Sequence, residues 1–178
     1  MASSGRVFIA CILVGLAGLS PACAPKGGAG AVPLPATDHP LRGSPAPDFR
    51  LPARGGASAS PSEHAGKVVL VDFWATWCEP CRSSFPQYQA LISRYQGRVV
   101  VLGISEDDEN EGIDRFATET GVAFPLAWDG DKSVAQSYQI TGMPTLFIVD
   151  QSGLVRFVHS GFRAGDEQQI SAAIDSLL

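Results

Sequence analysis

Hydrophobic and polar positions along the second half of the chain repeat with the periods of strands and helices. Residues 67–74 are apolar on both alternating faces apart from Asp72, which is typical of a central strand covered on both sides. Residues 80–95 place apolar side chains on one helical face. We expect further strands over residues 98–105, 123–128, 145–149 and 154–159, and further helices ending near residue 120 and over residues 131–138 and 166–178.

This alternation of strands and helices, closing in a hairpin, predicts an α/β sandwich with a mixed sheet. Pro80 fits the first turn of its helix, where a missing N–H costs nothing, and Pro86 predicts a kink farther along. The acidic run at residues 106–111 is interpreted as a solvated loop leading into the next helix.

The N-terminal pattern is that of a targeting segment. Arg6 precedes an apolar run over residues 7–19, which is too short to span a bilayer and fits the core of a signal peptide over residues 1–22. The run ends in Leu19-Ser20-Pro21-Ala22-Cys23, which resembles a bacterial lipobox and implies lipidation of Cys23. It departs from the usual pattern at Ser20, so ordinary cleavage at Ala22-Cys23-Ala24 or at Ala29-Gly30-Ala31 is the alternative.

A Pro-, Gly- and Ala-rich stretch follows, and residues 24–47 hold six of the chain's 13 prolines. Such a composition buries too little surface to offset its ordering entropy, so we expect a flexible tether over residues 23–44 and a folded domain over residues 45–178. The chain has 178 residues, 45% of them hydrophobic, which fits one globular domain. Its net charge of -5 argues against nucleic acid as a partner.

Cys78 and Cys81 form a C-x-x-C pair at the predicted strand-to-helix turn. A zinc site needs four ligands, whereas no second pair exists and His39, His64 and His159 are scattered. A purely structural disulfide would close too small a loop to stabilise much. At a helix N-terminus, however, the dipole favours the thiolate of Cys78, and Cys81 can attack a mixed disulfide one turn on. The spacing therefore favours redox exchange over a structural or metal role.

The sequence "VDFWATWCEPC" resembles the active site of the thioredoxin superfamily. The wider pattern, with "APDF" at residues 46–49, "GKVVLVDFWATWCEPCR" at 66–82 and "GMPTLFIVDQSG" at 142–153, is similar to the membrane-tethered TlpA/ResA-like thiol-disulfide oxidoreductases. The resemblance implies a thioredoxin-like three-layer sandwich, with a mixed central sheet, flanking helices and a helix-strand insertion between residues 105 and 132.

It also implies that Cys78 is the attacking nucleophile and Cys81 the resolving thiol. Asp72 matches the buried acid of thioredoxins, while Ser84 stands where several ResA-like proteins place a glutamate, so we expect Asp72 to accept the proton. The alternative is a polar residue on an exposed strand face, against which the apolar neighbours Val71 and Phe73 argue.

The resemblance places the substrate-binding residues around this pair. Pro144 would be a cis-proline facing the disulfide, and Met143 would offer backbone hydrogen bonds to an extended substrate. Trp77 would form an apolar rim for docking, with Glu79 and Pro80 beside it.

The leading interpretation is therefore an exported, monomeric reductase of disulfides in envelope proteins, without cofactor or metal. It would be re-reduced by a membrane donor of the thioredoxin-transporter type, with apocytochrome c among possible clients. One alternative is a peroxidase of peroxiredoxin type, whose P-x-x-x-[ST]-x-x-C pattern fails at Val71 and Ala75. The other is a copper-binding chaperone, for which the cysteine spacing is one residue short and only His159 could add a ligand.

Overall fold

The computed structural model describes Leu34 and residues 38–178, so the predicted signal peptide, both cleavage sites and Cys23 lie outside the described residues. The strands are β1 (Leu51–Pro52), β2 (Ser58–Ala59), β3 (Val68–Trp74), β4 (Val99–Ser105), β5 (Leu126–Trp128), β6 (Thr145–Val149) and β7 (Val155–Ser160). The helices are α1 (Glu79–Arg94), α2 (Ile113–Thr120), α3 (Ser133–Tyr138) and α4 (Asp166–Asp175), with 3-10 turns η1 (Arg54–Gly56) and η2 (Pro61–His64). Within the described residues no helix is long and apolar enough to cross a membrane.

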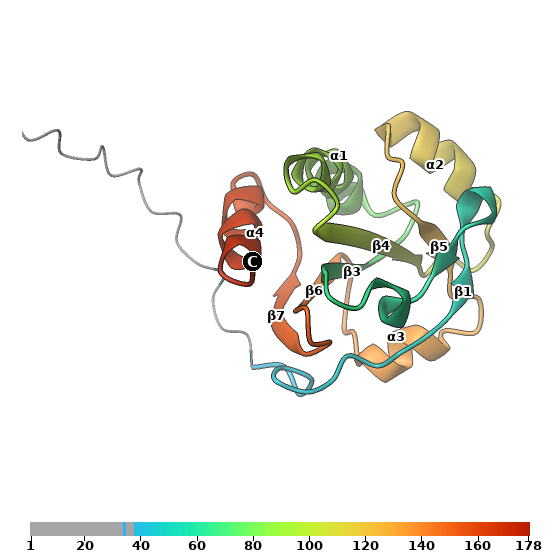
Figure 1. Ribbon diagram of the computed structural model, residues 1–178. Helices are drawn as coiled ribbons and strands as arrows, with labels where there is room; N and C mark the ends of the chain where they lie inside the picture. The colour runs from blue at the N-terminus through green and yellow to red at the C-terminus, as the bar shows by residue number, and fades with distance from the viewer. Residues whose placement is uncertain (1–33, 35–37) are drawn as a thin grey trace, which may run out of the picture. The chain divides into compact units, whose positions relative to one another are not determined.

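Five strands form one mixed sheet in the order β5-β4-β3-β6-β7 (Figure 1). β3 lies at its centre, parallel to β4 and antiparallel to β6. Every residue of β3 is buried, which confirms the prediction that this doubly apolar run is a central strand. β6 and β7 form the expected antiparallel hairpin, and α1 runs through Pro86 as one continuous helix.

The two faces of the sheet carry separate layers of helices (Figure 1). Alternate residues of β3 point to opposite sides, so Leu70 and Trp74 pack with buried residues of α1, α2 and α4, whereas Val71 and Phe73 pack with those of α3. The result is the predicted three-layer arrangement. Asp72 has the same parity as Leu70 and Trp74, so it belongs to the face that α1 covers.

An aromatic cluster fixes α1 and α2 on the end of the sheet nearest the cysteines. The Trp74 ring centroid lies 4.9 Å from that of Phe85 in α1 and 4.3 Å from that of Phe116 in α2. Gly103 in β4 is needed beneath this cluster, because a Cβ there would come within 2.6 Å of Leu126 and 3.2 Å of the Trp74 indole nitrogen. The cluster therefore holds both helices close to the segment that follows β3.

The segment ahead of β1 runs along the outer strand β7. Val155 donates its N–H to the Ser44 carbonyl at 2.9 Å and accepts the N–H of Gly43 at 2.7 Å. At the other edge of the sheet, Ala53 forms a bridge to Ala127 in β5. Contacts with the folded domain thus begin before residue 45, and residues 43–53 pair with both outer strands.

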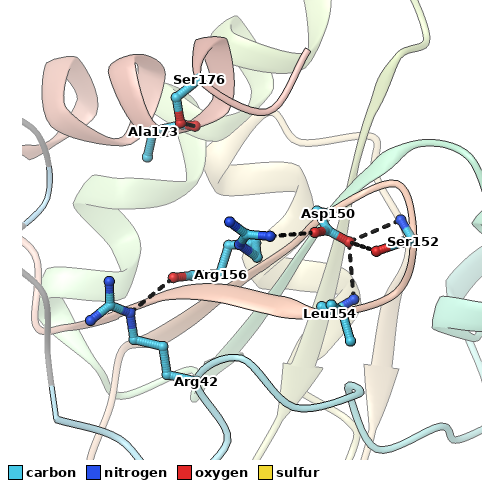
Figure 2. Close-up of polar contacts among 7 residues, drawn as sticks. All are labelled: Arg42, Asp150, Ser152, Leu154, Arg156, Ala173 and Ser176. Atoms are coloured by element: carbon cyan, nitrogen blue, oxygen red, sulfur yellow. Dashed lines mark hydrogen bonds and ion pairs between the residues drawn. The ribbon is translucent and has the colours of Figure 1, made fainter.

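The turn between β6 and β7 is held by Asp150 (Figure 2). Its carboxylate accepts the backbone N–H of Ser152 at 2.9 Å and of Leu154 at 3.1 Å, and lies 3.2 Å from the guanidinium of Arg156. These contacts satisfy the exposed N–H groups of the turn and fix the register of the hairpin.

Candidate active site

The two cysteines lie at the junction between β3 and α1. Cys78 is the N-cap of α1, its sulfur accepts the Cys81 backbone N–H at 3.3 Å, and a disulfide joins the two residues with their Cα atoms 5.3 Å apart. The structure therefore describes the oxidised pair. Cys81 is fully buried and Cys78 is 5% exposed, so Cys78 is the more accessible of the two residues. A sulfur at this cap faces unpaired N–H groups and the positive end of the helix dipole, which stabilise a thiolate there.

The residues flanking Cys78 are exposed. Trp77 is 71% exposed although it follows a strand that is entirely buried. Glu79 and Pro80 form the exposed first turn of α1. Trp74 is buried in the core, as its sequence context predicts, and Trp77 lies at the surface beside the disulfide, where the docking rim is expected.

Asp72 is fully buried on the α1 side of the sheet. One carboxylate oxygen accepts the hydroxyl of Tyr88 at 3.4 Å, and the other is buried with no hydrogen-bond partner. Burial raises the pKa of Asp72 well above its ordinary value, and the Tyr88 hydrogen bond opposes that shift only in part. A carboxyl group in this state holds or accepts a proton in a range where an exposed aspartate is already ionised. The alternative of an exposed strand face is wrong for Asp72.

Tyr88 and Cys81 are seven residues apart, two turns of α1, and both are fully buried. Since helical side chains lean toward the helix N-terminus, the Tyr88–Asp72 contact extends toward the cysteine end of α1. Tyr88 and Cys81 belong to the same buried cluster, and Asp72 contacts that cluster through the Tyr88 hydroxyl.

A buried acid that the sequence did not single out anchors the loop before Cys78. Asp107 is 6% exposed, and its two carboxylate oxygens lie 3.1 and 3.0 Å from the backbone nitrogen of Thr76. The Thr76 hydroxyl donates to one oxygen at 2.8 Å, and the Ser105 hydroxyl donates to the other at 2.8 Å. The expectation that the acidic run 106–111 is a solvated loop is therefore wrong at this position.

Glu106 is the second inward member of that run. Its backbone N–H donates to the carbonyl of Trp74 at 2.8 Å, which places it beside the end of β3. Burial, and next the negative charge of Asp129, raise the pKa of Glu106 to about 7, while the charge of Lys132 opposes the shift. The remaining members, Asp108 to Glu111, are exposed.

Met143 and Pro144 immediately precede β6, at the end of the sheet where β3 leads to the cysteines. The peptide bond between them is cis. Phe73 pairs with Thr145, the residue after Pro144, so the sheet register brings Pro144 level with the end of β3 that leads to the cysteines. Pro144 is buried and Met143 is half-buried.

Across residues 38–178, the structure gathers no group of three His, Cys, Asp or Glu side chains that could hold a metal ion. His159, the one histidine weighed as a copper ligand, has its Nε2 2.9 Å from a carboxylate oxygen of Asp166. The His159 ring therefore already pairs with the first residue of α4.

Comparison with known proteins gives consistent matches. The AhpC/TSA family model matches residues 42–158. The chain is 31% identical to the thioredoxin-like protein YneN of Bacillus subtilis over 136 residues, which covers 75% of this chain and 79% of that protein. It is 32% identical to the thiol-disulfide oxidoreductase ResA of Geobacillus thermodenitrificans over 120 residues, which covers 67% of this chain and 69% of that protein.

The fold matches solved structures as well. A crystal structure of a putative thiol:disulfide interchange protein DsbE from Chlorobium tepidum superposes with a TM-score of 0.69 at 36% sequence identity. That match covers 75% of this chain and 97% of the other.

Proposed function

This chain belongs to the AhpC/TSA family and is a thioredoxin-like thiol-disulfide oxidoreductase of ResA/DsbE type, and from that premise we propose that it reduces disulfides of envelope proteins through Cys78 and Cys81. The observation that carries the proposal is the Cys78–Cys81 disulfide at the N-terminus of α1. The proposed nucleophile, Cys78, follows the exposed Trp77, and the proposed resolving residue, Cys81, is fully buried.

The cycle begins when both cysteines are reduced. The Cys78 thiolate attacks one sulfur of a client disulfide, the client S–S bond breaks, and the client's first sulfur leaves as a thiolate that takes a proton. Cys81 then loses its proton and attacks the Cys78 sulfur. The Cys78–Cys81 disulfide forms, the client's second sulfur leaves, and two electrons have passed to the client.

Asp72 accepts the proton that Cys81 gives up. Its free buried oxygen and its raised pKa support this role, because a general base works best when its proton affinity is near that of the group it deprotonates. No glutamate is available at position 84, where the buried Ser84 donates its hydroxyl to the Cys81 carbonyl at 3.1 Å.

We place this chemistry on the periplasmic side of the bacterial cell envelope, with the domain anchored to a membrane. The signal-peptide pattern of residues 1–22 and the lipobox-like sequence at Cys23 support export and a lipid anchor, with residues 23–44 as the link to the domain. A membrane donor of thioredoxin-transporter type then returns two electrons to the disulfide. Apocytochrome c is one candidate client, since its haem-attachment cysteines must be reduced.

The test compares three variants of the full chain in its own cell envelope. Cys81→Ser should accumulate mixed disulfides through Cys78, because the resolving thiol is missing. Cys78→Ser and the double serine variant should trap no client and should lose insulin reduction. Trapping by Cys78→Ser at the level of Cys81→Ser would reverse the roles, and no trapping by any variant would contradict the proposed reaction.

A further inference from the structure

A hollow of about 210 Å³ lies between α2 and residues that neighbour the two cysteines in the sequence. Its wall includes Trp77 from the loop before Cys78, and Arg82, which follows Cys81 in α1. Arg115, Phe116 and Glu119 of α2 form the opposite wall, and Thr76 and Gly112 complete the lining. Trp77 therefore belongs both to the wall of the hollow and to the exposed surface beside Cys78.

The two arginines of this hollow share a single carboxylate. Arg82 Nη1 lies 2.8 Å from one oxygen of Glu119, and Arg115 Nε lies 3.8 Å from the other. The Arg82 guanidinium also lies over the Phe116 ring, 4.9 Å from its centroid, which holds it in place. The two guanidinium groups carry two positive charges and the Glu119 carboxylate carries one negative charge, so these three side chains leave one positive charge in excess. The Arg115 side chain is 78% exposed.

The acidic side chains nearby do not cancel this excess inside the hollow. The exposed acids Glu79, Asp108, Glu109 and Glu111 do not line the hollow, and Asp114, which precedes Arg115, is paired with Arg54 outside it. The start of α2 lies directly against the active-site loop: a Cβ on Gly112 would come within 3.0 Å of the Thr76 side chain. The arginine of α2 thus has a fixed position relative to the loop that carries Trp77.

We propose that this hollow, formed by Trp77, Arg82, Arg115, Phe116 and Glu119, binds an aspartate or glutamate side chain of the client polypeptide next to the cysteine under attack. The proposal rests on the proposed function, since it assigns the client's local chemistry. Trp77 supplies an apolar surface for the client backbone, and the incompletely paired guanidinium of Arg115 supplies the charge and the planar donor pair that a carboxylate accepts.

The experiment uses the purified full chain, pre-reduced, and two disulfide-linked peptides that differ only in whether Asp or Asn flanks each cysteine. The second-order rate constant for peptide reduction is measured by acid quench and mass spectrometry at low salt. Reduction of the same peptides by dithiothreitol corrects for the effect of the aspartates on the intrinsic reactivity of the peptide disulfide. The corrected ratio of Asp to Asn rate constants is the preference of the protein.

We expect the wild-type chain to prefer the Asp peptide by about two- to fivefold, the size of an exposed ion pair. Arg115→Gln should bring the ratio close to one. Glu119→Gln should raise it, because it frees both guanidiniums. Arg94→Gln, which changes another exposed arginine in the last turn of α1, should leave the ratio unchanged.

A wild-type ratio at or below one, or an Arg115→Gln ratio equal to that of wild type, would overturn the subsite. In that case reduction of the Asn peptide would still support the oxidoreductase assignment of Cys78 and Cys81. Failure to reduce either peptide would instead overturn the proposed function and the subsite with it.

Discussion

The backbone N–H of Thr76 points between the two carboxylate oxygens of Asp107, 3.1 and 3.0 Å from them. Thr76 stands two residues before Cys78, and Asp107 stands two residues beyond the end of β4. The carbonyl of Asp107 in turn accepts the Trp128 indole N–H and the Lys132 ammonium, at 2.8 and 2.7 Å. One residue therefore connects the active-site loop to the segment around β5 and α3.

Asp107→Asn should loosen this loop. The amide offers one acceptor oxygen where two are used, and its NH₂ group meets donors on Thr76 and Ser105. We expect a loss of about 1–3 kcal/mol in the free energy of unfolding, measured in urea, and a changed alkylation rate at reduced Cys78. Asp108→Asn, at the exposed neighbouring position, serves as the control and should stay within about 0.5 kcal/mol. Equal behaviour of the two variants would leave Asp107 without an anchoring role.

Asp72→Asn should slow disulfide reduction most near neutral pH and increase stability at the same time. Burial raises the pKa of Asp72, so the folded state keeps its proton where the unfolded carboxyl has lost it. The wild-type protein therefore loses stability as pH rises from the ordinary carboxyl value of 3.8 toward the raised folded value.

The asparagine side chain does not titrate, so the Asp72→Asn variant lacks this pH-dependent loss of stability. The difference in the free energy of unfolding between the two proteins should therefore widen by up to about 1.4 kcal/mol per pH unit between the ordinary and the raised pKa of Asp72. Denaturant unfolding at a series of pH values measures the gap, and insulin reduction over the same series measures the rate. A constant gap would show that Asp72 does not titrate there, and unchanged rates would make it a purely structural residue.

The reduction potential should be that of a reductant. Glu79 is the first residue of α1 and places a negative charge beside Cys78, which disfavours its thiolate, while Arg82 is engaged by Glu119 and Phe116. We expect a potential nearer about -270 mV than about -180 mV. Equilibration with glutathione or dithiothreitol buffers gives the value, and Glu79→Gln should make it less negative, with the exposed Glu109→Gln as control. A wild-type value at or above about -180 mV would indicate an oxidase or isomerase.

Cys23→Ala should move the protein from the membrane to the soluble envelope fraction. The expected reason is the loss of the lipid, which adds membrane affinity and no contact at the cysteine pair. Cell fractionation follows the location, and insulin reduction by the released protein should equal that of wild type. Mass spectrometry of an unmodified mature N-terminus at Val32 would contradict the lipoprotein assignment.

The strands, the helices and the cysteine pair were predictable because each has a local signature. The doubly apolar run of β3, Pro80 in the first turn of α1 and the W-C-x-P-C sequence all act within a few residues. Asp107 was not predictable, because which acid of the run 106–111 turns inward depends on where β4 ends beside Thr76. The pairing of residues 43–53 with the outer strands was also missed, since its two-residue strands are too short to show a period.

That pairing has a consequence for a protein whose substrates are other polypeptides. An unpaired outer strand is a template onto which any extended polypeptide can add, and such addition leads to co-aggregation. Here the Ser44 carbonyl accepts the N–H of Val155 on β7, Gly43 donates its N–H to the Val155 carbonyl, and Ala53 forms a bridge to Ala127 on β5. An extended polypeptide therefore finds these positions on both outer strands already paired, which leaves the end of the sheet where Cys78 lies as the place for a disulfide substrate to dock.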